Sequence, residues 1–202
     1  MGRRSVDVRR EEILAATVEE MGRRGMDQTR VRDVADRIGV STGLVFYHFD
    51  TRDKLLAAAL EHAVDLDLAR LRRALRRTGT SVERLQRVLR SYGPTGSAAG
   101  WRLWIDAWSH ALRNPATRAM LRTLDDRWRE TLVEVIADGV EAGQLRCADP
   151  RTSVARIGAM LDGLTVAVLV YSTVTRQQLR AWMWEAVAHE AGLAPGHLTP
   201  AS

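Results

Sequence analysis

The pattern of apolar and polar positions between residues 29 and 54 predicts two short helices joined by a tight turn. An apolar stripe at i, i+3, i+4 and i+7 marks the first helix: Val31, Val34, Ala35 and Ile38. Thr29 stands where a helix N-cap is expected, and Gly39 where a left-handed residue ends a helix. Ser41 caps the second helix after one intervening residue, so the two helices must cross steeply, as in a helix-turn-helix.

The second helix of this pair is short and contains no acidic residue from position 39 to 49. A helix of about two turns is marginal alone, so we expect packing through Val40, Val45 and Phe49 to hold it. The outer face then carries Thr42, Gly43, Phe46, Tyr47 and His48. Hydroxyl, phenol and imidazole groups beside a helix N-terminus are plausible partners for DNA phosphates. The spacing alone also fits a surface hairpin in some other all-helical protein.

A family resemblance favours the DNA-binding alternative. The segments Gly39–Gly43, Phe46–Phe49 and Lys54–Leu56 resemble, without a gap, the signature of the TetR family of bacterial repressors. In that family three N-terminal helices bind DNA, and the remaining helices form a ligand-binding and dimerising domain. The resemblance therefore implies a homodimer that binds a palindromic operator in double-stranded DNA and responds to a small molecule.

The resemblance also implies roles for individual residues. Tyr47 and His48 match positions that contact the groove and phosphates, and Lys54 matches a lysine that grips a phosphate. Thr42 matches a position contacting backbone or base edge, and Thr29 a capping residue that also touches phosphate. The complete expected DNA-binding set is Thr29, Ser41, Thr42, Gly43, Leu44, Phe46, Tyr47, His48 and Lys54.

Two residues depart from the family pattern. Leu44 stands in place of the usual threonine, serine or alanine, and Phe46 in place of the first tyrosine of a pair. Leu44 can offer only apolar contact, for example to a thymine methyl group, and Phe46 has no hydroxyl to donate. The operator sequence is therefore not inherited from any relative.

The remaining sequence predicts helices throughout, so the expected fold is all-α, with about nine helices. Caps, prolines and breaks place the later helices near residues 51–77, 82–92, 98–113, 115–142, 150–171 and 176–191. The first helix is expected at 13–21. We expect a helix-turn-helix DNA-binding domain at 1–50, a ligand-binding and dimerisation domain at 51–192, and a disordered tail at 193–202.

A tryptophan ridge marks the helix expected at 98–113. Trp101, Trp104 and Trp108 lie at i, i+3 and i+7, and Asp106 and His110 are four apart on an adjacent face. Ordinary core packing explains such a ridge, and so does the wall of a largely apolar ligand pocket. The pocket hypothesis assigns the effector to Trp101, Trp104, Asp106, Trp108, His110, Trp128 and Met160.

The stretch from Ile157 to Tyr171 is apolar around its whole circumference, with Asp162 as its only charge. Such a helix must be buried on several sides, either inside one chain or at an interface between two. We expect the second, with the interface formed by Ile157, Gly163, Ala167, Trp182 and Val187. The region from Trp101 to Leu164 is also similar, more loosely, to the C-terminal domain of BetI-type members of the family.

Composition narrows the class of protein. The net charge is +5, yet residues 1–55 hold eleven basic and ten acidic residues, so a DNA-binding face must be basic through segregation. Arg3, Arg4, Arg9 and Arg10 could form an arm toward DNA or a frayed terminus. One cysteine, Cys147, excludes an internal disulfide and fits the cytoplasm. We expect no secretory signal and no membrane span.

Two competing classes have weaker support. The five histidines show no metal-ligand spacing, and neither a phosphate-binding glycine loop nor a nucleophile elbow occurs, so we expect no enzyme, metal or cofactor. A helical adaptor that binds only other proteins remains an alternative, because such a protein could have the same composition as this chain. The expected function is a ligand-released transcriptional repressor.

Overall fold

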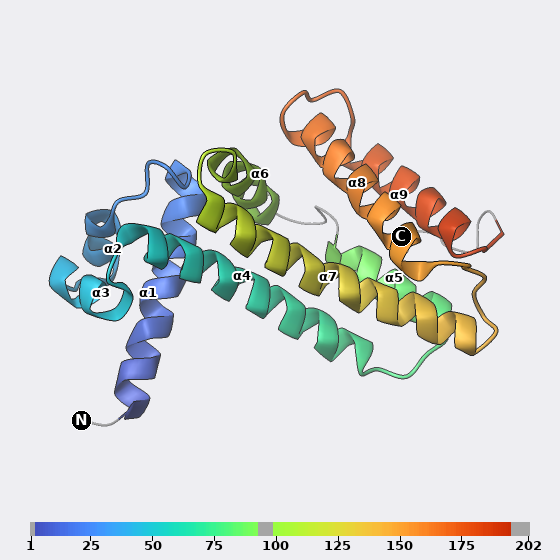
Figure 1. Cartoon of the computed structure of the whole chain (residues 1–202), viewed down its shortest axis with the longest axis horizontal. Helices are drawn as coiled ribbons and strands as arrows, with labels where there is room; N and C mark the ends of the chain where they lie inside the picture. The colour runs from blue at the N-terminus through green and yellow to red at the C-terminus, as the bar shows by residue number, and fades with distance from the viewer. Residues whose placement is uncertain (1–2, 93–98, 195–202) are drawn as a thin grey trace. The chain divides into compact units, whose positions relative to one another are not determined.

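Nine α-helices make up the part of the chain that the computed structural model describes, residues 3–92 and 99–194, and no strand occurs there (Figure 1). The helices are α1 (Arg3–Arg24), α2 (Val31–Ile38), α3 (Thr42–Phe49), α4 (Arg52–Leu75), α5 (Ser81–Tyr92), α6 (Ala99–Ala111), α7 (Pro115–Glu141), α8 (Pro150–Leu169) and α9 (Arg176–Glu190). The all-α prediction is confirmed. Most of the expected tail lies outside the described residues.

The chain forms two compact units. The first contains residues 1–67 and 102–124, and the second contains residues 68–101 and 125–202. The long helices α4 and α7 each contribute to both units. The boundary expected after residue 50 coincides with the end of α3, whereas the first unit also takes in the beginning of α4, nearly all of α6 and the start of α7.

In the first unit α2 packs on both α1 and α3. Its core contains Ile13, Val34, Val45 and Leu55, each 1% exposed or less. Arg52, at the start of α4, fastens the loop between α1 and α2. Its guanidinium donates to the carbonyl oxygens of Met26 at 2.6 Å, Asp27 at 2.8 Å and Thr29 at 2.8 Å. The loop that leads into the helix-turn-helix is thus fixed by α4.

In the second unit α8 and α9 lie side by side (Figure 1). Asp149 caps α8 and Pro150 occupies its first turn, where a missing N–H costs nothing. A capping box starts α9, because the Thr175 hydroxyl accepts from the Gln178 N–H at 3.1 Å and the Gln178 side chain accepts from the Thr175 N–H at 2.9 Å. These local signals explain why both helices begin where the sequence predicts.

Two expectations about helix ends were wrong. The helix α1 begins at Arg3, ten residues before the expected start, so the four N-terminal arginines lie on helical turns and do not form an extended arm. The helix expected from residue 82 would have Ser81 as its cap, but the cap of α5 is Thr80, whose hydroxyl accepts from the Glu83 N–H at 3.2 Å. Ser81 instead donates its N–H to Gln144 at 2.7 Å.

The helix α8 is long and apolar enough to cross a membrane by length and composition alone. The sequence prediction was that no membrane span occurs. A core helix in a soluble protein passes the same test, and α8 buries one face, including Val154, Ile157 and Leu161, at 1–2% exposure. Its length and composition are therefore weak evidence for a membrane span.

Candidate nucleic-acid interface and effector region

The short helix α3 presents one side to solvent and buries the other. Its start is fixed by Ser41, whose hydroxyl accepts from the Leu44 N–H at 3.2 Å. Val45 and Phe49 are 1% and 5% exposed and hold the helix in the first unit, as expected. Phe46 and Tyr47 are 44% and 76% exposed, which is unusual for large aromatic side chains.

Four more members of the expected DNA-binding set lie on α3. Thr42 and Gly43 are exposed at the N-terminal end of α3, and Leu44 and His48 are half-buried. The ring of Tyr47 meets that of His48 edge to face, with centroids 5.4 Å apart. On the inner side, the guanidinium of Arg10 lies 5.0 Å from the centre of the Phe49 ring and joins α1 to the end of α3.

Lys54 lies on the first turn of α4, close to the end of α3. Its Nζ forms an ion pair with Asp50 Oδ2 at 2.9 Å, and both side chains are well exposed. The Lys54 N–H donates to the hydroxyl of Thr51 at 3.2 Å, which fixes the start of α4. The only lysine of the chain is therefore held beside the exposed face of α3.

Thr29 does not belong to this face. The residue is 1% exposed, and its hydroxyl donates to the carbonyl oxygen of Gly25 at 2.7 Å. The N-cap of α2 is Arg30, whose N–H donates to Asp33 at 3.3 Å. The expectation that Thr29 caps α2 and touches phosphate was wrong, because the hydroxyl is turned inward to close the end of α1.

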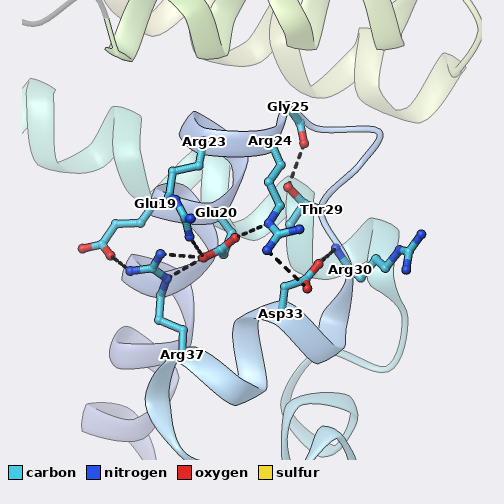
Figure 2. A network of polar contacts seen from close by, with 9 residues as sticks. All are labelled: Glu19, Glu20, Arg23, Arg24, Gly25, Thr29, Arg30, Asp33 and Arg37. Atoms are coloured by element: carbon cyan, nitrogen blue, oxygen red, sulfur yellow. Dashed lines mark hydrogen bonds and ion pairs between the residues drawn. The ribbon is translucent and has the colours of Figure 1, made fainter.

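A buried carboxylate that the sequence analysis missed joins α1 to α2 (Figure 2). The Glu20 side chain is 3% exposed and accepts hydrogen bonds from Arg24 at 2.8 Å and Arg37 at 2.7 Å. Arg23 adds a contact at 2.9 Å, and Arg37 also pairs with Glu19 at 2.8 Å. The first and second helices of the DNA-binding unit are thus connected by charge as well as by apolar packing.

The charge state of Glu20 follows from this surrounding. Burial alone would raise its pKa, but hydrogen bonds from Arg37 and Arg24 and the charge of Arg23 outweigh it, so the pKa lies below the ordinary value. The position of Glu20 in the sequence already indicated a buried carboxylate. Glu20 follows Ile13, Ala16 and Thr17 at helical spacing, on the same side of α1 as the apolar Ile13 and Ala16, and a carboxylate at such a position needs partners nearby.

Asp106 and His110, expected to anchor a ligand, have protein partners within the first unit. The carboxylate of Asp106 accepts the N–H of Met26 in the loop between α1 and α2. His110 Nδ1 lies 2.9 Å from the Thr117 hydroxyl, and its Nε2 lies 3.8 Å from Asp27. These side chains therefore connect α6 with the loop before α2, and they do not pair with one another as the four-residue spacing suggested.

The tryptophan ridge lies on α6 as the spacing predicts. Trp101, Trp104 and Trp108 are all half-buried, and the rings of Trp104 and Trp108 are in tilted contact with centroids 6.4 Å apart. Trp128 on α7 is 8% exposed, and Met160 on α8 is half-buried. Only Trp101, Trp128 and Met160 of the expected ligand residues belong to the second unit.

A cluster of polar side chains in the second unit lies where α8 faces α7. Gly158 of α8 lies against Arg129 of α7, since a Cβ at this glycine would approach its Nη1 to 2.5 Å. Arg129 pairs with Asp125 at 2.6 Å. One turn after Gly158, burial and the nearby charge of Asp125 raise the pKa of Asp162 to about 6, against the opposing charge of Arg129.

Thr165 lies on the same side of α8. Positions 158, 162 and 165 fall within about 60° of one another at 100° per residue. The Thr165 hydroxyl is buried and has no hydrogen-bond partner among the described residues. A half-buried carboxylate and an unsatisfied hydroxyl on one helix face are polar groups that a ligand can complete.

The expected dimer residues separate into two groups. Ile157 and Val187 are 1% and 0% exposed inside a single chain, so their assignment to an interface between chains was wrong. Gly163 is exposed, Ala167 is half-buried and Trp182 is 38% exposed. A Cβ added at Gly163 would meet no atom within 4 Å. These three residues leave an apolar surface on α8 and α9.

Comparisons with known proteins agree with this arrangement. Residues 13–59 match the family described as bacterial regulatory proteins, tetR family, and residues 81–192 match the BetI-type transcriptional repressor C-terminal family. The HTH-type transcriptional regulator BetI of Paraburkholderia phymatum is 28% identical over 161 residues, covering 78% of this chain and 80% of that protein.

Solved structures give the same result for the whole fold. A putative transcriptional regulator from Saccharomonospora viridis, crystallised in complex with choline, has a TM-score of 0.81 and 28% identity, covering 91% of this chain and 97% of its own. A putative TetR-family regulator from a Rhodococcus species has a TM-score of 0.79 and 26% identity, covering 91% and 98%.

Proposed function

This chain belongs to the TetR family and carries a BetI-type C-terminal domain, and from this premise we propose that it is a homodimeric repressor released from its operator by a small cationic effector. The protein is a DNA-binding transcriptional regulator and not an enzyme. Repression, the dimer, the effector and a cytoplasmic location are the proposed parts. One observation supports the assignment of the DNA-binding face: Phe46 and Tyr47 are exposed on a helix whose other side is buried.

The DNA-contacting set is formed by Ser41, Thr42, Gly43, Leu44, Phe46, Tyr47, His48 and Lys54. Tyr47 and Lys54 contact phosphates, because a phenol and an ammonium are suitable donors and both are exposed. Phe46 and Leu44 offer apolar contact in the groove, which suits thymine methyl groups. Thr29 is left out because it is buried.

A dimer is required because one α3 reads only half of a palindrome, and the second copy must place its α3 one helical turn away, about 34 Å. The apolar surface of Gly163, Ala167 and Trp182 is the proposed interface. Exposed apolar residues beside a small-residue stripe allow two helices to approach closely, and a twofold axis repeats the same patch on both chains. Ile157 and Val187 support this surface from inside.

The effector class is a quaternary ammonium ion such as choline. The relative from Saccharomonospora viridis was crystallised with choline, and the present chain places Asp162 and Thr165 on one face of α8. The carboxylate supplies the opposite charge, and the hydroxyl supplies a hydrogen bond. Trp128, next to Arg129 on α7, adds an aromatic ring of the kind that binds such cations.

The first experiment identifies the operator and the effector together. Fragments of the source genome that bind the purified protein are selected and footprinted, and the expected protected site is a palindrome. Choline is then titrated against the complex and is expected to release it. The matched control is dimethylbutanol, in which carbon replaces the nitrogen of choline, and it should not release DNA because it has no charge for Asp162.

Three results would contradict the proposal. A protected site without twofold symmetry would argue against the dimeric reader. Release by dimethylbutanol at the same concentration as choline would argue against recognition of a cation. A protein that binds no fragment at low salt would favour the alternative of a helical adaptor for other proteins.

A further inference from the structure

The recognition helix α3 ends at an acidic residue with unusual backbone geometry. Asp50 has φ 58° and ψ −53°, one of two positive φ values outside glycine in the described residues. The Thr51 N–H donates to the Phe49 carbonyl oxygen at 2.6 Å across it, so Asp50 is the centre of a three-residue γ-turn. This turn is rare because a side chain at positive φ is strained, and it reverses the chain between α3 and α4.

The turn brings the Asp50 carboxylate to Lys54. The Oδ2 atom lies 2.9 Å from Nζ, and the two side chains are 71% and 66% exposed. The ammonium that matches a phosphate ligand therefore already has an anionic partner in the absence of DNA.

Asp50 interrupts a segment that is otherwise free of negative charge. No acidic residue occurs from position 39 to 49, so the exposed face of α3 has none of its own. A DNA phosphate that approaches Lys54 has to displace the carboxylate and then remain within a few ångströms of it. Unit charges at such distances interact strongly enough to change an equilibrium several-fold even near water.

We propose that Asp50 competes with DNA phosphate for Lys54 and thereby lowers the affinity of this regulator for DNA of any sequence. The inference rests on the proposed function, in which Lys54 contacts a phosphate. Phosphate contacts carry no sequence information, and they supply nearly all non-specific binding. An internal anion at such a contact therefore restrains non-specific binding in a protein whose net charge is +5.

The test uses a duplex of random sequence, so it needs no knowledge of the operator. Affinities of the full-length protein, Asp50→Asn, Lys54→Ala and the double variant are measured by fluorescence anisotropy over a range of salt concentrations. Asparagine suits position 50 because it tolerates positive φ. Asp53→Asn is the matched control, since Asp53 is also exposed on the same turn but lies 3.4 Å from Arg52 and not on Lys54.

Asp50→Asn is expected to bind the duplex about 3- to 30-fold more tightly at low salt, with the slope of log K against log salt steeper by about one. Lys54→Ala is expected to remove this gain in the double variant, and Asp53→Asn is expected to give a smaller gain than Asp50→Asn. Unchanged or weaker binding by Asp50→Asn overturns the inference, because the carboxylate then either does nothing or orients the lysine. A gain that survives Lys54→Ala also overturns it.

The same data separate this inference from the proposed function. If Lys54→Ala weakens DNA binding while Asp50→Asn changes nothing, only the role of Asp50 fails. If Lys54→Ala itself leaves binding unchanged, the proposed phosphate contact fails and the role of Asp50 fails with it. Circular dichroism and melting curves of all variants establish that each comparison is made between folded proteins.

Discussion

The carboxylate of Asp106 on α6 accepts the main-chain N–H of Met26, in the loop between α1 and α2. Met26 is 2% exposed, so its N–H has no access to water as a substitute partner. Arg52 of α4 holds the carbonyl oxygen of the same residue at 2.6 Å. The peptide groups that lead from α1 into the helix-turn-helix are thus bound by side chains from two other helices.

Replacing Asp106 by alanine is expected to lower the free energy of unfolding by about 1–3 kcal/mol, because a buried N–H loses its acceptor. Asp106→Asn retains a carbonyl oxygen as acceptor, so its free energy of unfolding is expected to fall by less than that of the alanine variant. Urea denaturation followed by circular dichroism measures both values. Equal stability of the alanine variant and the parent protein would show that the Met26 N–H does not depend on this carboxylate.

Glu20→Ala is expected to destabilise the DNA-binding unit by about 1–3 kcal/mol at neutral pH, since three arginines lose a shared anion. The arginine side chains are partly exposed, which limits the loss. DNA affinity is expected to fall as well, because Glu20 and Arg37 fix α2 relative to α1. Glu19→Ala is the control, since Glu19 is 63% exposed and pairs with the same Arg37.

The effect of Glu20 is expected to depend on pH in a defined direction. Its pKa is lowered on folding, so its stabilisation is fully present above the unfolded value of 4.5 and is lost as the pH falls through the folded value. Denaturation curves of Glu20→Gln and the parent protein should therefore converge in acid below pH 4.5. A difference that stays constant from neutral pH into that range would contradict this assignment.

Asp162 is expected to behave in the opposite way. Its pKa is raised on folding from 3.8 to about 6, so the folded state binds the extra proton and stability falls as the pH rises between these values. Asp162→Asn is therefore expected to stabilise the effector-free protein at pH 7 by about 1–3 kcal/mol and to have little effect below the lower value. Thermal melts at several pH values measure this.

The same variant tests the proposed effector site. Asp162→Asn is expected to weaken release of DNA by choline at least tenfold at neutral pH, because the cation loses its opposite charge. In the parent protein the response to choline should decline as the pH falls below about 6. If the variant is more stable than the parent protein yet responds normally to choline, Asp162 destabilises the folded protein and has no role in effector binding.

Gly163→Asp is expected to produce a monomer that fails to bind a palindrome. A side chain at this position meets no atom within 4 Å in the single chain, so the variant is expected to fold. Gly100→Asp is a suitable control, because that glycine also lies in open space on a helix. Light scattering at micromolar concentration measures the mass. A dimeric Gly163→Asp would exclude this surface from the interface.

The tryptophan ridge gives a prediction that is measured by fluorescence. If the rings of Trp104 and Trp108 contact the effector, a ligand that releases DNA will quench their fluorescence. Trp104→Phe and Trp108→Phe are then expected to reduce both the quenching and the affinity. Unaltered values in both variants would identify the ridge as ordinary core packing.

The sequence by itself determined the helices and most of the exposed side of α3. Caps, helix-ending glycines and apolar stripes are local signals, so Gly39 correctly predicted the end of α2, Ser41 the start of α3, and the spacing of Val45 and Phe49 the buried side of α3. Family membership was predictable for the same reason, since the signature is a short continuous segment.

The tertiary structure decided which side chains are available for function. Thr29 and Asp106 turn to the loop around Gly25 and Met26 because their partners lie on other turns or helices, which no local pattern reveals. Burial of Ile157 beside exposed Gly163 likewise depends on which face of α8 packs on α9. Glu20 found its third arginine seventeen residues away, and a charge on an apolar stripe becomes acceptable only when the fold brings such a partner to it.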